Sequence, residues 1–102
     1  MNISLEDCIS LCGLDKDEIA GIAEHEHIPK IAAAALAQYL LDQPGGTARI
    51  RDMLVDDFRS AMRQHNKAHA RELLAALRHF TATHRDELVA EHAKAPPRSG
   101  SA

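Results

Sequence analysis

The sequence predicts an all-α fold, a small orthogonal or bundle-like domain of about five helices that ends in an antiparallel αα-hairpin. Apolar residues recur at spacings of three and four, as in amphipathic helices, and no segment alternates with period two as a half-buried strand would. Only three of the 102 residues are aromatic, so the core must be built mainly from Leu, Ile, Ala and Met. A chain of this length has room for one modest core.

Two short helices are predicted near the amino terminus, separated by Gly13. The first begins near Ser4, whose side chain can cap a helix. The stretch Asp15–Glu18 matches a capping box, in which the first and fourth residues bond each other's backbone, and it predicts a second helix through Ala23. Ile28 precedes a proline, which disfavours helical backbone, so we expect a break there.

The stretch from Pro29 to Leu41 is predicted to form the central helix. It is rich in alanine and leucine, both strong helix formers, and proline suits a first helical position. The run Pro44-Gly45-Gly46 ends it. Its few polar positions share one narrow strip, so nearly its whole circumference is apolar. Such a helix is expected to have neighbours on most of its sides.

Two longer helices form the predicted hairpin. Thr47 is expected to cap the first, which runs from Ala48 to about His65. Asn66 marks the break between the two helices, and the second continues to Lys94. At 1.5 Å per residue the second helix would be ~40 Å long and the first ~27 Å. The longer arm is therefore expected to extend beyond its partner.

Residues 1–94 are predicted to form a single domain, and residues 95–102 a disordered tail that is too poor in apolar residues to order itself. The overhanging arm carries Leu88 and Val89 past the end of its partner. Because exposed apolar side chains favour association, and two-fold dimers are its commonest form, we expect a homodimer through the hairpin that Leu88→Asp would weaken.

The net charge of −3 is unevenly distributed along the chain. Up to Gly46 there are eight acidic residues and two lysines, whereas the remainder has seven acidic residues and ten Lys and Arg. This asymmetry favours an oriented encounter with a charged partner. Nucleic-acid binding is not expected, because the arginines of the second half are interleaved with acidic residues rather than gathered into a basic face.

The sequence also predicts a cytoplasmic location. No apolar run reaches ~18 residues, so no transmembrane helix is expected, and the acidic amino terminus does not resemble a secretory signal. Cys8 and Cys12 lie four apart on one helix, where a disulfide would be strained. Reduced thiols are therefore expected, as in a cytoplasmic protein.

Seven histidines are the one compositional excess that suggests chemistry. His65 and His69 are four apart, and on an unbroken helix they would share a face and form a pair suited to Zn²⁺ or Ni²⁺. Glu72 would continue that face as a third ligand. The objection is Asn66, which lies between the two histidines and would destroy the ligand geometry if it broke the helix.

A second candidate metal set spans the first two helices and consists of Cys8, Cys12, His25 and His27. The spacing is close to that of a zinc finger. However, the two histidines are closer in sequence than a finger requires, and both cysteines lie on the apolar side of their helix. Buried free cysteine behaves as a small apolar residue, so core packing is the favoured interpretation.

A third candidate set, His84, Glu87 and Glu91, shares one side of the last predicted helix and resembles a carboxylate–histidine site. Ordinary surface residues near a helix end give the same pattern, because the helix dipole also favours a histidine there. His84 falls on the apolar stripe, which favours a histidine packed in the core.

No phosphate-binding loop, GxSxG or HExxH motif is present, and no nucleophile can be matched with a base and an orienting group, so enzyme activity is not expected. The sequence favours a small cytoplasmic helical adaptor or regulatory module that associates with another protein or with itself. The alternative is a His-dependent metal-binding or metal-sensing protein.

Overall fold

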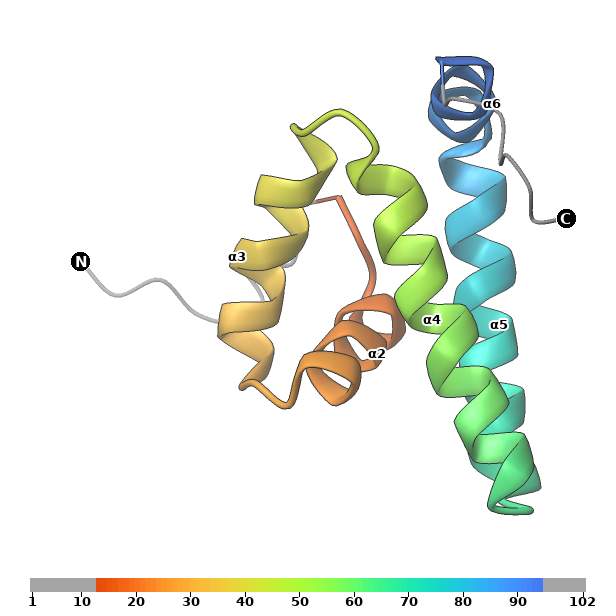
Figure 1. The fold of residues 1–102 in the computed structure, drawn as a ribbon. Helices are drawn as coiled ribbons and strands as arrows, with labels where there is room; N and C mark the ends of the chain where they lie inside the picture. Colours follow the sequence, from red (N-terminus) through yellow and green to blue (C-terminus); the bar gives the residue numbers. More distant parts are fainter. Residues whose placement is uncertain (1–12, 95–102) are drawn as a thin grey trace, which may run out of the picture.

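A computed structural model describes residues 13–94, which fold into five α-helices without any strand (Figure 1). The helices are α2 (Lys16–Glu26), α3 (Lys30–Leu41), α4 (Gly46–Arg63), α5 (Lys67–Thr83) and α6 (Arg85–Lys94). The predicted all-α class is confirmed for this part of the chain. The helix predicted to begin near Ser4 and the tail predicted at 95–102 lie outside the described residues. None of the helices between residues 13 and 94 is both long and apolar enough to span a bilayer.

The central helix is α4, which packs against all four of the others (Figure 1). The pair α2 and α3 covers one side of it and α5 the other, while α6 lies near its amino-terminal end. The core between them is a cluster of buried apolar side chains: Leu14, Ile19, Ile22, Ala23, Ala33, Ala34, Ala37, Leu40, Ile50, Met53, Leu54 and Phe80.

The prediction that the Pro29–Leu41 stretch is the central helix is wrong, because α3 lies at the edge of the bundle, against α2 and α4 (Figure 1). It buries Ala33, Ala37 and Leu40 in the core and leaves Ile31 and Tyr39 exposed. An apolar circumference permits neighbours on every side, but the number of neighbours depends on the other helices. The larger apolar side chains of α4 make the main packing surface.

The ends of α2 follow the local sequence signals. The Asp15 carboxylate accepts a hydrogen bond from the Glu18 amide at 2.9 Å, and the Glu18 carboxylate accepts one from the Asp15 amide at 3.0 Å. The predicted capping box is thus confirmed. At the other end, His27 adopts a left-handed conformation with φ 56°, and the chain turns through Ile28 and Pro29 into α3.

The turn between α3 and α4 depends on two glycines. Gly45 has φ +78°, a conformation that favours glycine, and a Cβ on Gly46 would lie 1.5 Å from the Leu40 carbonyl oxygen. The prediction that Thr47 caps this helix is wrong: α4 begins at Gly46 and Thr47 is buried. The first amides of α4 instead donate to Glu91 of α6.

The C-terminal half differs from the predicted hairpin in its second arm. α4 and α5 lie side by side, and Asn66 caps α5 by accepting a hydrogen bond from the His69 amide at 3.3 Å (Figure 1). The prediction that the second arm continues to Lys94 is wrong, because α5 ends at Thr83 and α6 is a separate helix set at an angle. The bonds from α4 to Glu91 hold α6 against α4, so the expected overhang does not exist.

Candidate functional site

Histidine–carboxylate contacts between helices gather around α2. Three such contacts cross from one helix to another in residues 13–94: His25 with Asp56 of α4, and His69 and His79 of α5 with acidic residues of α2. They form two groups, one at each end of α2.

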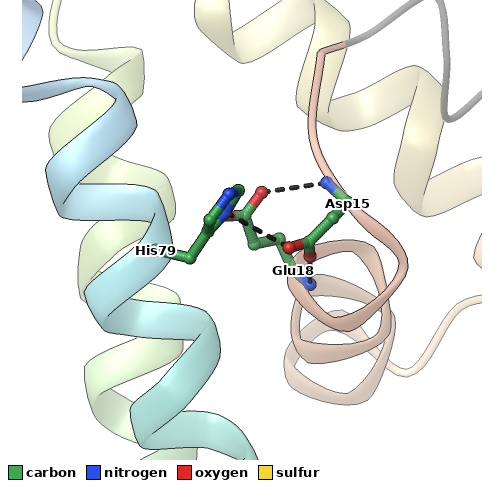
Figure 2. Close-up of side chains that lie close together, drawn as sticks. All are labelled: Asp15, Glu18 and His79. Carbon is green, nitrogen blue, oxygen red and sulfur yellow. Dashed lines mark hydrogen bonds and ion pairs between the residues drawn. The ribbon is translucent and has the colours of Figure 1, made fainter.

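The first group lies at the amino-terminal end of α2 and consists of Asp15, Glu18 and His79 (Figure 2). Glu18 is fully buried, and its Oε2 lies 2.7 Å from His79 Nδ1. The Asp15 carboxylate lies 3.2 Å from the same nitrogen. The hydrogen bond with Glu18, followed by the charge of that carboxylate, raises the pKa of His79 above its ordinary value. His79 therefore fastens α5 to the capping box of α2.

This first group is the only one in the described part of the chain where three potential metal ligands lie within contact of one another. However, both Glu18 oxygens are already occupied, one by the Asp15 amide and the other by His79. Asp15 in turn accepts from the Glu18 amide. These bonds satisfy the buried carboxylate, so the arrangement is complete as a structural contact between helices.

The second group exists because α2, α4 and α5 approach one another closely at Gly21. A Cβ on Gly21 would lie 2.4 Å from Leu54 Cδ2 of α4 and 3.7 Å from Leu73 Cδ2 of α5. Residues three or four positions away from a contact lie on the same face of each helix, one turn along. One turn from this crossing, the three helices carry Glu24, His25, Asp57 and His69, and the exposed Asp56 precedes Asp57 on α4.

Hydrogen bonds form two separate contacts in this second group. His69 Nε2 bonds to Glu24 Oε1. His25 lies between two carboxylates, with Nδ1 2.7 Å from Glu26 Oε2 and Nε2 3.2 Å from Asp56 Oδ2. Burial, the largest single effect, lowers the pKa of His25, but the two hydrogen bonds and the charges of Asp57 and Glu26 together outweigh it, so the net direction is upward.

Asp57 is the exceptional member of the second group. It is only 6% exposed, and its Oδ2 is buried without a hydrogen-bond partner in the described structure. Burial, followed by the neighbouring Glu24 carboxylate, raises the pKa of Asp57 to about 6, while His25 and His69 act in the opposite direction. A buried carboxylate oxygen without a partner is unusual in a folded protein and calls for a physical explanation.

Sequence reasoning did not select Asp57, although it carries a signal. The buried series on α4 is Ile50, Leu54, Asp57 and Ala61, and these positions are separated by three or four residues. A carboxylate in the middle of an apolar stripe indicates either a buried partner or a bound ligand. Glu24 carries no comparable signal, because its contact with His69 depends on how α2 and α5 cross.

The structure separates His65 from the other two predicted metal ligands, His69 and Glu72. His65 lies exposed in the α4–α5 turn with φ 58°, and Asn66 caps α5, so the unbroken helix that the prediction required does not exist. His69 contacts Glu24, and its Nδ1 lies 3.8 Å from Glu72 Oε1. Only His69 therefore belongs to the second group.

The predicted Cys2His2 set cannot be placed as a whole, since Cys8 and Cys12 lie outside the described residues. Of its histidines, His25 bonds to carboxylates and His27 is exposed at the end of α2.

The predicted carboxylate–histidine set is not brought together. His84 stacks on the Phe80 ring, with the ring centroids 4.3 Å apart, and its Nδ1 lies 3.2 Å from the Phe80 carbonyl oxygen. Glu91 is bound to the start of α4, and Glu87 is exposed.

One further surface is apolar rather than charged. The side of α3 that faces away from α2 and α4 carries Ile31, Ala35 and Tyr39 at four-residue spacing, with the exposed polar Gln38 on the same side. Ile31 and Tyr39 are 47% and 61% exposed. Below, this surface is called the open side of α3.

Comparison of the chain with protein-family models, curated proteins and solved structures gave no significant match.

Proposed function

We propose that this chain is a small, non-catalytic helical association module of the cytoplasm, which binds a second copy of itself through the open side of α3. The observation that carries the proposal is the exposure of Ile31 and Tyr39 on a helix that is apolar around nearly its whole circumference. A helix of this composition normally lies between neighbours. In the described structure, α3 has neighbouring helices, α2 and α4, on one side only.

The charges at the two ends of α3 favour an antiparallel pair. Its amino-terminal amides have no side-chain cap and Lys30 lies beside them, whereas Asp42 lies at the carboxyl-terminal end, where its own helix dipole disfavours an acidic residue. In a two-fold antiparallel pair, Asp42 of each copy lies next to the uncapped, positive end of the other. Ala35, near the middle of the open side, permits close approach of the two backbones.

The contact is small, and the dimer is expected to be weak. Covering the exposed parts of Ile31 and Tyr39 in both copies removes four partly exposed side chains from water, worth roughly 1–2 kcal/mol each before the cost of association. Because this gross gain of about 4–8 kcal/mol barely exceeds the cost of association, we expect a dissociation constant of about 1 mM, which corresponds to a net binding free energy of about 4 kcal/mol.

Sedimentation equilibrium over a wide range of protein concentration tests this proposal. The native chain is expected to dimerise, and Tyr39→Glu to remain monomeric with an unchanged circular dichroism spectrum. Val89→Asp is the matched control, because Val89 is as exposed as Tyr39 but lies on α6. If Val89→Asp and Leu88→Asp abolish the dimer while Tyr39→Glu does not, the interface lies at the C-terminal helices.

Charge reversal tests the antiparallel geometry separately. Asp42→Lys is expected to weaken the dimer, and the double variant Lys30→Glu with Asp42→Lys to restore it. Failure of this restoration would contradict the antiparallel arrangement. A native chain that stays monomeric at millimolar concentration would refute the proposal as a whole and leave the open side of α3 to a partner of a different sequence.

A further inference from the structure

We propose that Asp15, Glu18 and His79 form a binding site for one divalent transition-metal ion, which would join the start of α2 to α5 (Figure 2). Within residues 13–94 this is the one place where ligand atoms of three potential metal ligands all lie within 4.8 Å of one another. The imidazole comes from α5, and the two carboxylates come from the N-cap and the first turn of α2. The proposal is independent of the α3 dimer, because none of these residues lies on α3.

The capping box of α2 uses only one oxygen of each carboxylate. Glu18 Oε1 accepts the hydrogen bond from the Asp15 amide, and Asp15 Oδ1 accepts the one from the Glu18 amide. The other two oxygens, Glu18 Oε2 and Asp15 Oδ2, lie 2.7 and 3.2 Å from His79 Nδ1. A cation between these three atoms would leave both capping bonds in place. The capping box would then act as the outer hydrogen bonding that orients metal-bound carboxylates.

As a contact between helices, the group is complete when Nδ1 of His79 carries a proton, and the ion would take the place of that proton. A single N–H cannot point directly at two oxygens, whereas a metal ion binds three or four atoms at once. A divalent ion with a neutral imidazole also balances the charge of two carboxylates, of which a protonated imidazole balances only one. The amino-terminal dipole of α2 opposes the ion with about half a positive charge, which is less than the charge of the two carboxylates.

The ligand atoms need only a small adjustment to hold an ion. A tetrahedral zinc ion with bonds of about 2.0–2.1 Å keeps its ligand atoms about 3.3 Å apart. The Asp15 oxygen is already close to this distance from His79 Nδ1, and the separation from the Glu18 oxygen would have to increase by roughly 0.6 Å. The His79 side chain is 55% exposed, so the imidazole can make this shift while the buried Glu18 stays in place.

The ligand set indicates the class of ion. One imidazole nitrogen with two carboxylate oxygens suits Zn²⁺ and the neighbouring ions Co²⁺ and Ni²⁺, whereas Mg²⁺ and Ca²⁺ prefer oxygen ligands alone. Three protein ligands leave the fourth position of a tetrahedral ion to water. Because the Asp15 side chain is 44% exposed and His79 is more so, both the ion and this water can reach the site from solvent.

The histidines at the other end of α2 do not offer a comparable set. His69 meets Glu24 through Nε2 and Glu72 through Nδ1, so its two carboxylate contacts are made by different nitrogens of the ring. His25 likewise meets its two carboxylates through different nitrogens. In the described structure each of these nitrogens faces a single carboxylate, whereas His79 Nδ1 faces two. His69 lies on α5, as His79 does, and therefore provides the matched control.

Isothermal titration of the chelator-treated full chain with ZnCl₂ tests the proposal. The native chain is expected to bind one equivalent. Its melting temperature is expected to rise by roughly 10–20 °C at about a hundredfold excess of free Zn²⁺ over Kd, because the assembled site exists only in the folded chain.

Asp15→Asn is the decisive variant, because asparagine caps a helix about as well as aspartate does. With its amide oxygen on the Glu18 N–H, its NH₂ group would face His79, and an NH₂ group cannot bind a cation. Asp15→Asn and His79→Gln are each expected to weaken Zn²⁺ binding at least about tenfold. His69→Gln and His65→Gln are expected to bind as the native chain does. Circular dichroism of each variant checks that it is folded.

Histidine side-chain ¹⁵N NMR gives a second measurement that does not depend on stability. One equivalent of Zn²⁺ is expected to shift the Nδ1 resonance of His79 and to leave those of His25 and His69 in place. Absence of stoichiometric binding by the native chain would overturn the proposal. So would native affinity in both Asp15→Asn and His79→Gln, or a Zn²⁺-dependent shift at His25 or His69 without one at His79.

Discussion

Glu91 accepts a hydrogen bond from the backbone amide of Ala48 at 2.8 Å, although 43 residues separate the two in the chain. The same carboxylate also accepts from the Thr47 amide at 3.2 Å. α4 has no side-chain cap of its own, since Gly45 is its N-cap. The central helix is therefore capped by the last one, and this contact holds α6 against the bundle.

Replacement of Glu91 tests this long-range cap. Glu91→Ala is expected to lower the stability by about 1 kcal/mol, the usual cost of losing an N-cap, and to speed hydrogen exchange at the Thr47 and Ala48 amides. Glu87→Ala, on the same helix but exposed and without such a bond, is expected to change neither quantity. Equal effects of the two substitutions would show that α6 is held by something other than the cap.

The His79–Glu18 contact predicts a specific dependence of stability on pH. Because Glu18 raises the pKa of His79 in the folded state, the added stability is fully present below the unfolded pKa of about 6.5 and is lost as pH rises through the higher folded value. The melting temperature of His79→Gln is therefore expected to lie furthest below that of the native chain near pH 6. This difference in melting temperature is expected to become smaller by about pH 8.5. A gap that widens with pH would contradict this sign.

Gly21 is predicted to be intolerant of even one methyl group. Gly21→Ala places a Cβ 2.4 Å from Leu54 Cδ2, and Leu54 is fully buried, so its side chain has to shift within the packed core. We expect a net loss of about 1–2 kcal/mol, in which overpacking exceeds the gain in helix propensity. On a Leu54→Ala background, which removes the clash, the same substitution is expected to be neutral or stabilising. Additive losses in urea unfolding would refute this explanation.

Asp57→Asn is predicted to stabilise the protein. The folded pKa of Asp57, about 6, exceeds its ordinary value of 3.8, so stability falls as pH rises through this interval, with Glu24 and Asp56 adding to the penalty and His25 and His69 reducing it. Removing the charge is expected to add about 1–3 kcal/mol at pH 7 and almost nothing near pH 4. Urea unfolding at pH 7 and at pH 4 measures this change in the free energy of unfolding. If the variant is less stable than the native chain at pH 7, the Asp57 carboxylate already has a partner.

The sequence alone determined several features that depend on short spans of chain, although not the start of α4, where the predicted Thr47 cap is wrong. The capping box of Asp15 and Glu18, the break around Ile28 and the cap at Asn66 each involve residues within four positions of one another. Their hydrogen bonds form within a single turn, so composition and order are sufficient to predict them. The all-α class follows from the same local signals, repeated along the chain.

Only the tertiary structure decided which helix is central and which side chains meet. The apolar circumference of α3 does not reveal that one side stays open, and a continuous helical pattern to Lys94 does not reveal the bend after Thr83. The burial of Asp57 and the contacts of His69 and His79 arise where α2, α4 and α5 cross. Such contacts depend on the angle and depth of packing between helices, which are properties of the whole set of side chains and not of any one segment.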